Sequence, residues 1–443
     1  MRYNEVMMEQ LKKRIIEMCN AEYFIGYVMP HRDIYRENST STKTRIVYDA
    51  SSKQKNECSL NDSLFSGENL NPNLVDIILK FRKYQIAFSG DIARAFLQIA
   101  VAECDKNYLC FLYYKNCDKS QPVVLYHFNR HCFGVTCSPY VLAATIKTHL
   151  KSYEKSHPLA YDMLNNSLYV DDLFYGSSTV DEAFKLSVDA VSILKDANMT
   201  MRKFDTNSEE LKMLWENSDS LIEINKNSDT HLKVLGLNWN NIKDTLSLNL
   251  NSLLTELDET CTKRNVLHTA ARIFDPSGLI SPFLIRIKCL LQELWQLGLD
   301  WDEEFSGEIK QHWLKWCREI KEIKKLEIPR FYFANSVSQE NVQLHVFSDA
   351  SLKSFGAVAY FRYQTSSGTF NTSFVISKAR VAPLKKLTLP RLELMGAIIA
   401  ARIVKHLKEI FKNLERIFMW SDSTIVLHWI KGQPAKWKQV RLQ

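Results

Sequence analysis

Apolar and polar positions along the chain predict helices and strands in mixed order. Apolar residues that recur every three to four positions predict helices, and short apolar or alternating runs predict strands. The expected helices cover 4–18, 74–81, 138–150, 180–197 and 390–411, and the expected strands cover 46–48, 85–89, 199–204, 232–239, 342–348, 356–363, 370–377 and 416–421. Residues 251–326 are mostly helical in pattern, and 216–230 and 333–341 are polar. This mixture predicts an α+β multidomain fold.

The same pattern suggests where the domains divide. The chain has 443 residues, enough for roughly two to four domains. We expect a first domain over 1–250, a helical domain over 251–335 and an α/β domain over 340–443, because the character of the pattern changes near 251 and again near 342.

Composition narrows the class of protein only a little. The net charge is +7, from 57 basic and 50 acidic residues, which permits a polyanionic partner without requiring one. The ten cysteines form no Cys-x-x-Cys pair, so we expect reduced thiols and no zinc site. The charged first helix is not a signal peptide, and no apolar run reaches membrane-spanning length. We therefore expect no membrane contact and a cytoplasmic location.

Three aspartates at predicted strand ends are the first candidate chemistry. Asp91 follows the strand 85–89, and Asp171 and Asp172 lie at the turn of an apolar hairpin over 168–175. An Asp-Asp pair alone is more often an ordinary surface turn. Here apolar residues on both sides would bury the two charges, which favours a bound cation. Carboxylates converging from separate strand ends suit two-metal phosphoryl transfer.

Two strings carry a family resemblance. Tyr169-Val170-Asp171-Asp172 resembles the polymerase signature of retroelement reverse transcriptases, and Ser89 to Phe96 resembles their first acidic motif. The resemblance implies a right-hand polymerase of fingers and palm, with Asp91, Asp171 and Asp172 as catalytic residues and Asp91 and Asp171 as metal ligands. It also implies that Phe96 is a steric gate that favours dNTPs over ribonucleotides, although without the motif Phe96 would be taken for a core aromatic.

The resemblance extends to residues that would contact nucleotide and primer. The implied nucleotide-binding residues are Lys43, Arg45, Phe96, Phe133, Gly134, Tyr169 and Lys203, and the implied primer grip is Leu235-Gly236. Retroviral enzymes usually carry Gln where this chain has Phe133. The alternative for Lys43 and Arg45 is a solvated basic loop, which has about equal weight for Lys43, and Arg45 is the better match to the family. Lys203 is a candidate general acid for pyrophosphate.

Longer strings resemble the Pao/BEL class of long-terminal-repeat retrotransposons. They are Arg45 to Ser51, Ser59 to Leu64, Arg272 to Ile280, Leu291 to Trp295, Asp300 to Asp302 and Leu389 to Leu394. The resemblance implies a polyprotein fragment with fingers and palm, a helical thumb or connection and a ribonuclease H-like domain. An aspartic protease is excluded, because Asp349-Ala350-Ser351 lacks the glycine that such an active-site loop needs.

A second set of acids matches the ribonuclease H-like part. Asp349 ends a strand, Glu393 is expected in the first turn of the helix 390–411, and Asp422 ends another strand. Each residue also has a purely structural interpretation, since Glu393 suits a helix N-terminus and Asp422 suits an N-cap. The family's fourth acid is missing, because no acidic residue follows Asp422. We therefore expect this domain to lack its C-terminal end and its activity to be uncertain.

The leading hypothesis is an RNA-directed DNA polymerase. It implies two Mg²⁺ per site, with Mn²⁺ as the alternative ion, held by Asp91, Asp171, Asp349, Glu393 and Asp422. Implied partners are an RNA template, a DNA primer or RNA–DNA hybrid, dNTPs, and a second copy or other polyprotein products. The alternatives are a catalytically inactive nucleic-acid-binding relic and an RNA-directed RNA polymerase, against which Phe96 argues.

Overall fold

The computed structural model describes residues 2–19, 24–35, 44–115, 120–218, 221–225, 232–334, 336, 341–412 and 414–432. The chain forms two compact units that alternate along the sequence. The first comprises 1–72, 88–175 and 180–228, and the second comprises 73–87, 176–179 and 229–443. Within the described ranges, no helix has both the length and the apolarity needed to cross a lipid bilayer.

The first unit opens with short elements around an aromatic core. They are α1 (Arg2–Lys12), β1 (Ile16–Met18), β2 (His31–Tyr35), β3 (Thr44–Tyr48), α2 (Leu60–Ser63), β5 (Cys110–Tyr114) and β6 (Val123–Phe128). The predicted helix over 4–18 is wrong beyond Lys12, because Arg14 has a φ of 52° and β1 pairs with β6. Ile15 and Ile16 are buried among the aromatic residues of this core, which favours strand over helix there.

A four-stranded sheet carries the first set of aspartates, and we call it the palm sheet. Its order is β7-β8-β4-β9, from Leu168–Tyr169, Asp172–Ser177, Ile86–Ile92 and Met201–Thr206. Strand β4 continues through Asp91 instead of ending before it. The helices of this part are α4 (Ser138–Leu150), α5 (Pro158–Ser167), α6 (Val180–Asp196) and α7 (Glu209–Glu216), and α6 and α7 both pack against β9. The predicted helices 138–150 and 180–197 are confirmed within one residue.

The second unit contains a small antiparallel sheet followed by helices. The sheet order is β10-β11-β12-β13, from Leu232–Val234, Leu237–Asn240, Thr245–Leu248 and Glu327–Pro329. The predicted single strand over 232–239 is wrong, because Leu235 and Gly236 have φ of 47° and 89° and turn the chain back. The helices are α8 (Asn251–Thr255), α9 (Lys263–Ala271), α10 (Ser281–Gln296) and α11 (Gly307–Ile323), as the helical pattern over 251–326 predicts.

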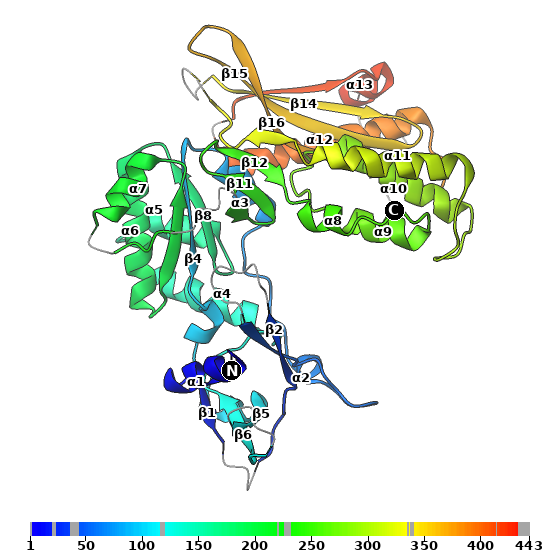
Figure 1. The fold of residues 1–443 in the computed structure, drawn as a ribbon. Helices are drawn as coiled ribbons and strands as arrows, with labels where there is room; N and C mark the ends of the chain where they lie inside the picture. The colour runs from blue at the N-terminus through cyan, green and yellow to red at the C-terminus, as the bar shows by residue number, and fades with distance from the viewer. Residues whose placement is uncertain are drawn as a thin grey trace. The chain divides into compact units, whose positions relative to one another are not determined.

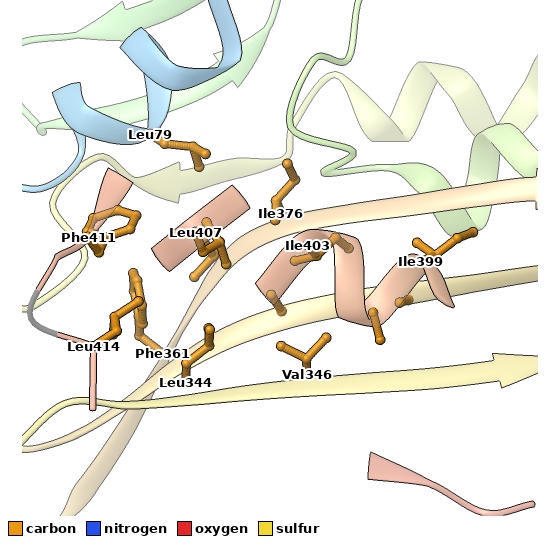
Figure 2. Close-up of a cluster of buried hydrophobic side chains, with 14 of the residues drawn as sticks. Leu79, Leu344, Val346, Phe361, Ile376, Ile399, Ile403, Leu407, Phe411 and Leu414 are labelled. Carbon is orange, nitrogen blue, oxygen red and sulfur yellow. The ribbon is translucent and has the colours of Figure 1, made fainter. Parts of the chain in front are cut away.

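A second four-stranded sheet follows in this unit. Its order is β16-β15-β14-β17, from Phe370–Val381, Ser354–Gln364, Gln343–Ala350 and Arg416–Ser421. Strands β14, β15 and β16 are antiparallel, and β17 runs parallel to β14. The remaining helices are α12 (Leu389–Ile410) and α13 (Thr424–Lys431). Ile399, Ile403 and Leu407 of α12 share a buried core with side chains of this sheet, as Figure 2 shows.

Helix α3 (Leu74–Phe81) belongs to the second unit although it precedes the palm sheet in sequence. Leu79 lies in the core shared with α12 (Figure 2). Asp76 Oδ1 lies 2.6 Å from His406 Nε2. In the segment after α3, Arg82 donates to Arg330 O at 3.1 Å and Phe374 O at 2.9 Å. Strand β4 starts at Ile86, so its first residues adjoin this anchored segment (Figure 1).

A fully buried arginine completes that anchor. Arg330 has no exposed side-chain surface and donates to both carboxylate oxygens of Asp244, at 2.6 and 2.8 Å. Its other hydrogen bonds go to the backbone oxygens of Phe81, Tyr84 and Gln85, each at 2.7 Å. A buried charge with a paired carboxylate and satisfied donors is stable, whereas breaking such a pair is costly. The four backbone and side-chain partners therefore fix the segment before β4.

Candidate functional site

A tight hairpin turn presents the Asp-Asp pair, as the sequence predicts. Tyr169 pairs with Asp172, so Val170 and Asp171 are the two turn residues. Val170 has a φ of 58°, and the Asp171 carbonyl oxygen accepts a hydrogen bond from the Ile92 amide at 2.7 Å. This bond ties the turn to β4, the strand that carries Asp91.

Asp91 lies opposite Arg202 in the pairing of β4 with β9. Its carboxylate accepts from Arg202 Nε at 3.2 Å and from Arg202 Nη2 at 3.4 Å, and Lys203 Nζ lies 3.5 Å away. Lys203 has a φ of 52°. Two cations of this chain therefore neutralise Asp91, and the predicted candidate Lys203 contacts this carboxylate directly.

The other two palm aspartates are held in an environment that disfavours their charge. Burial, together with the charges of Asp171 and Asp91, raises the pKa of Asp172 to about 7. Burial and Asp91 also raise the pKa of Asp171, while Arg202 and Arg45 oppose that rise. Desolvated like charges at one site are costly without a neutralising ion. The donor set, hard carboxylate oxygens on rigid strand ends, therefore fits Mg²⁺ or Mn²⁺.

The predicted nucleotide-binding residues gather partly around this turn. Arg45 is exposed on β3, and its charge acts on Asp171. Phe96 is 8% exposed and packs edge-to-face on Phe133, at 4.8 Å between ring centroids, while Phe133 is half exposed. Tyr169 is half-buried beside the turn. Lys43 lies outside the described residues.

Gly134 is required by its surroundings. Its φ is 98°, and a Cβ there would lie 2.4 Å from the carbonyl oxygen of Tyr48 on β3. The Asn61 amide group donates to Gly134 O at 2.9 Å, and Asn61 Oδ1 accepts from the Thr136 amide at 2.8 Å. Sequence reasoning did not single out Asn61, because nothing in its neighbourhood in sequence signals a contact with 134–136.

The predicted primer grip is a turn, and it has an aromatic neighbour. A Cβ on Gly236 would lie 2.6 Å from the ring of Phe274, so only glycine permits this approach. Phe274 is 46% exposed. It lies in the string Arg272 to Ile280, which carried the family resemblance and was given no role of its own. Asp275 in the same string accepts from the amides of Leu279 and Ile280, at 2.8 and 2.9 Å.

The second set of acids converges in the second unit. Carboxylate oxygens of Asp349, Glu393 and Asp422 all lie within 4.8 Å of one another, and no other group of three or more acids, histidines or cysteines in the described residues does so. Glu393 is 8% exposed, and its Oε2 is buried without a hydrogen-bond partner. Burial, Asp422 and Asp349 raise the pKa of Glu393. An orphaned carboxylate oxygen facing two further acids fits a divalent cation.

The structural interpretations of two of these acids are wrong. Helix α12 begins at Leu389, so Glu393 lies in its second turn and not in the first, where a helix dipole acts on it. Asp422 is not an N-cap, because Ser423 caps α13 and accepts from the Val426 amide at 3.4 Å. Thr388 is the N-cap of α12 but its side chain caps no amide.

Comparisons with known proteins agree with this architecture. Residues 33–236 match the reverse transcriptase (RNA-dependent DNA polymerase) family, and residues 262–423 match the Pao retrotransposon-like RNaseH-like domain. No protein with a curated functional description matches the sequence.

Three solved structures of foamy viral protease-reverse transcriptase share the fold over 99% of this chain. The complex with an RNA/DNA hybrid is 13% identical, with a TM-score of 0.58, and the chain spans 50% of its length. The dRH form with double-stranded DNA is 14% identical, with a TM-score of 0.61 and 65% of its length covered. A further complex with double-stranded DNA is 15% identical, with a TM-score of 0.59 and 78% covered.

The two family matches follow each other along one chain and share no residue. The first contains the palm sheet with the Asp-Asp turn, and the second contains Asp349, Glu393 and Asp422. The chain therefore carries a reverse transcriptase domain followed by a Pao retrotransposon-like RNaseH-like domain.

Proposed function

We propose that the chain is an RNA-directed DNA polymerase that adds dNTPs to a primer 3′-hydroxyl. The observation that carries the proposal is the hydrogen bond that ties the Asp171-Asp172 turn to the strand carrying Asp91, together with the effect of the Asp91 charge on Asp172, in a reverse transcriptase domain. The pKa values of Asp172 and Asp171 are both raised, so their ionised forms are disfavoured, and a bound divalent cation would neutralise the two charges.

Asp91 and Asp171 are the proposed ligands of Mg²⁺, with Mn²⁺ as the alternative. When bound, a pair of such ions activates the 3′-hydroxyl and stabilises the leaving pyrophosphate. The charge of Asp172 contributes to the electrostatic potential of the site. Arg202 and Lys203 neutralise the Asp91 carboxylate when no metal ion is bound to it. Lys203 is also the proposed general acid that protonates the leaving pyrophosphate. Its Nζ lies 3.5 Å from the Asp91 carboxylate, which places it at the site.

The surrounding residues supply nucleotide selection. Arg45 and Lys43 are proposed to bind the triphosphate, and Tyr169 and Gly134 to line the incoming nucleotide. Phe96 packs on Phe133 and is proposed to exclude the ribose 2′-hydroxyl, because a closely packed, buried ring cannot move aside to make room for the extra oxygen. Leu235 and Gly236 are proposed to hold the primer.

We also propose a division of the chain into three domains. Residues 1–250 form fingers and palm, 251–335 the helical thumb or connection, and 340–443 the ribonuclease H-like domain. The gap between the two family matches, 237–261, supports a change of domain near 250.

The proposed nucleic-acid partners are an RNA template, a DNA primer and their hybrid. The supporting observation is that fold relatives were solved with an RNA/DNA hybrid and with double-stranded DNA. The mild positive net charge permits such partners. A second copy, or another product of the polyprotein, is a further proposed partner.

Primer extension tests the polymerase proposal. The full chain is given an RNA template, a DNA primer, dNTPs and Mg²⁺, beside Asp171→Asn, which keeps the side-chain volume. We expect extension by the parent chain and a loss of more than about a hundredfold in the variant, because a metal ligand supplies several kcal/mol to the transition state. Equal extension by both proteins would contradict the proposal.

We also propose that Asp349, Glu393 and Asp422 bind divalent cations for cleavage of RNA in a hybrid. The orphaned Glu393 Oε2 supports this role. Release of labelled RNA fragments from an RNA/DNA hybrid, lost in Glu393→Gln, tests it. Cleavage that survives in Glu393→Gln would refute it.

A non-catalytic nucleic-acid-binding relic is the second candidate function. The observation that favours it is the pairing of Asp91 with Arg202 and Lys203, which occupies a proposed metal ligand. Salt-sensitive hybrid binding without primer extension would select this candidate.

A further inference from the structure

The turn that presents the Asp-Asp pair is strained. Val170 is the first of two turn residues and has a φ of 58°, whereas Asp171 after it does not have a positive φ. These φ signs are those of a type II′ hairpin turn, in which glycine is preferred at the first position. A β-branched residue there is a genuine outlier and costs about 1–3 kcal/mol. Contacts between the turn and the rest of the protein must therefore offset this conformational cost.

A side chain from a distant segment supports this turn. Asn71 Oδ1 accepts the backbone N–H of Val170 at 3.2 Å. Asn71 is itself held by Asn69, whose Oδ1 accepts from the Asn71 amide at 3.1 Å and from Asn71 Nδ2 at 3.3 Å. The contact therefore starts from an ordered side chain and not from a freely rotating one.

Packing contacts and a second hydrogen bond also hold the turn in place. A small pocket behind the turn is lined by Asn71, Pro72 and Val170 together with apolar residues of α4 and α5. On the other side, the Ile92 amide holds the Asp171 carbonyl. The turn is thus fixed from β4 and from Asn71, and Asn71 is the one of these two supports that a substitution can remove without touching the backbone.

We propose that Asn71 is a positioning residue for the proposed polymerase site, which fixes the Val170 turn and thereby aims Asp171 and Asp172 at the divalent cations. This inference rests on the proposed function of the aspartates. Asn71 is not one of the proposed metal or substrate ligands, and its proposed effect acts through the turn.

The first test is steady-state primer extension by the full chain with Asn71→Leu, which is nearly isosteric and has no acceptor. We expect kcat to fall about tenfold, since small displacements of catalytic groups are costly. KM for dNTP should stay within about twofold, because substrate binding is not addressed, and the Mg²⁺ concentration for half-maximal rate should rise. The matched control is Asn166→Leu on α5, which loses only a 2.8 Å bond to Asp162 and should match the parent.

A rescue experiment separates positioning from general stability. Val170→Gly removes the strain of the left-handed turn, so the turn should no longer depend on Asn71. We expect Asn71→Leu to lower kcat much less in the Val170→Gly background than in the parent. Parent-like kcat in Asn71→Leu, or the same loss in both backgrounds, would overturn the proposal.

Metal binding gives a readout that needs no activity. Mn²⁺ is titrated by electron paramagnetic resonance in an Asp349→Asn background, which weakens the second acidic site. Asn71→Leu should weaken Mn²⁺ binding about tenfold, as loss of a supporting residue does, with Asp171→Asn as the limiting case. If the parent chain extends primers but Asn71→Leu leaves the Mn²⁺ affinity unchanged, the inference about Asn71 is wrong and the polymerase proposal stands. If the parent chain does not extend primers but its Mn²⁺ binding depends on Asn71, the polymerase proposal is wrong and the positioning role of Asn71 stands.

Discussion

At the scale of single residues, the palm site is built at a cost to the fold. Asp172 is desolvated beside Asp171 and Asp91, and its pKa is raised to about 7. Val170 is held in a conformation that its branched side chain disfavours. Strained and desolvated groups are retained where chemistry needs them, and removing the charge of Asp172 should stabilise the protein while abolishing its activity.

Asp172→Asn tests this conflict between stability and function. Because the folded-state pKa lies above the ordinary value, the folded form is favoured while Asp172 is protonated and loses stability as pH rises from about 4 to about 7. Without metal at pH 8, the variant should be more stable than the parent by more than about 1 kcal/mol, and the difference should vanish near pH 4. Thermal unfolding in EDTA measures this, and Mg²⁺ should narrow the gap. Identical unfolding temperatures at pH 8 would contradict the expectation.

A second residue-scale prediction concerns Gly134. Gly134→Ala combines a positive φ with a contact of 2.4 Å to Tyr48 O, so the segment must move and KM for dNTP should rise about tenfold. Gly298→Ala is the matched control, since its φ is 70° but nothing lies within 4 Å of the added Cβ. The control should lose about 1 kcal/mol of stability with unchanged KM. Equal KM changes in both would show that Gly134 acts only through folding.

At the scale of elements, buried arginines decide how α3 and the small sheet are joined. Arg330 binds Asp244 beside β12 and three backbone oxygens of 81–85, and Arg82 donates to Arg330 O and lies 4.1 Å from the ring of Tyr332. Strand β4 follows this segment directly. The segment that leads into strand β4 is therefore held by Arg330, which lies more than two hundred positions later in the sequence.

Arg330→Met should destabilise the chain by about 3–5 kcal/mol, because it removes a fully buried guanidinium that pairs with Asp244 and leaves the backbone oxygens of Phe81, Tyr84 and Gln85 without this donor. Arg264→Met is the matched control: it also pairs in a bidentate manner with an aspartate, Asp302, but both side chains are exposed. Its loss should stay below about 1 kcal/mol. Urea unfolding compares the two, and similar losses would show that burial of the Arg330 pair adds nothing.

At the scale of the whole molecule, the two units interleave along the sequence. Residues 73–87 and 176–179 belong to the second unit, although each is flanked by segments of the first. Leu79 of α3 is fully buried in the core that includes Leu344 and Leu407 (Figure 2). The chain therefore cannot be divided into two folding units by one cut.

Removing residues 340–443 should abolish primer extension, because the deletion takes away most of the core that buries Leu79. The remaining apolar side chains of that core, including Tyr332 and Phe333, would then be exposed to water. The point variant Glu393→Gln in the full chain should keep primer extension, since it changes only the second acidic site. Soluble expression and extension assays on both proteins check this. A stable, active chain lacking 340–443 would show that the shared core is dispensable.

The sequence by itself determined the elements whose signals are local. Helices 138–150 and 180–197, the hairpin of the Asp-Asp turn and the strand–helix–strand order of Asp349, Glu393 and Asp422 follow from periodicity, and the family strings follow from residue identity. Only the tertiary structure decided the rest. It turned 232–239 into a hairpin, joined α3 to the second unit and brought Asn71 to Val170, because these depend on contacts between residues far apart in sequence.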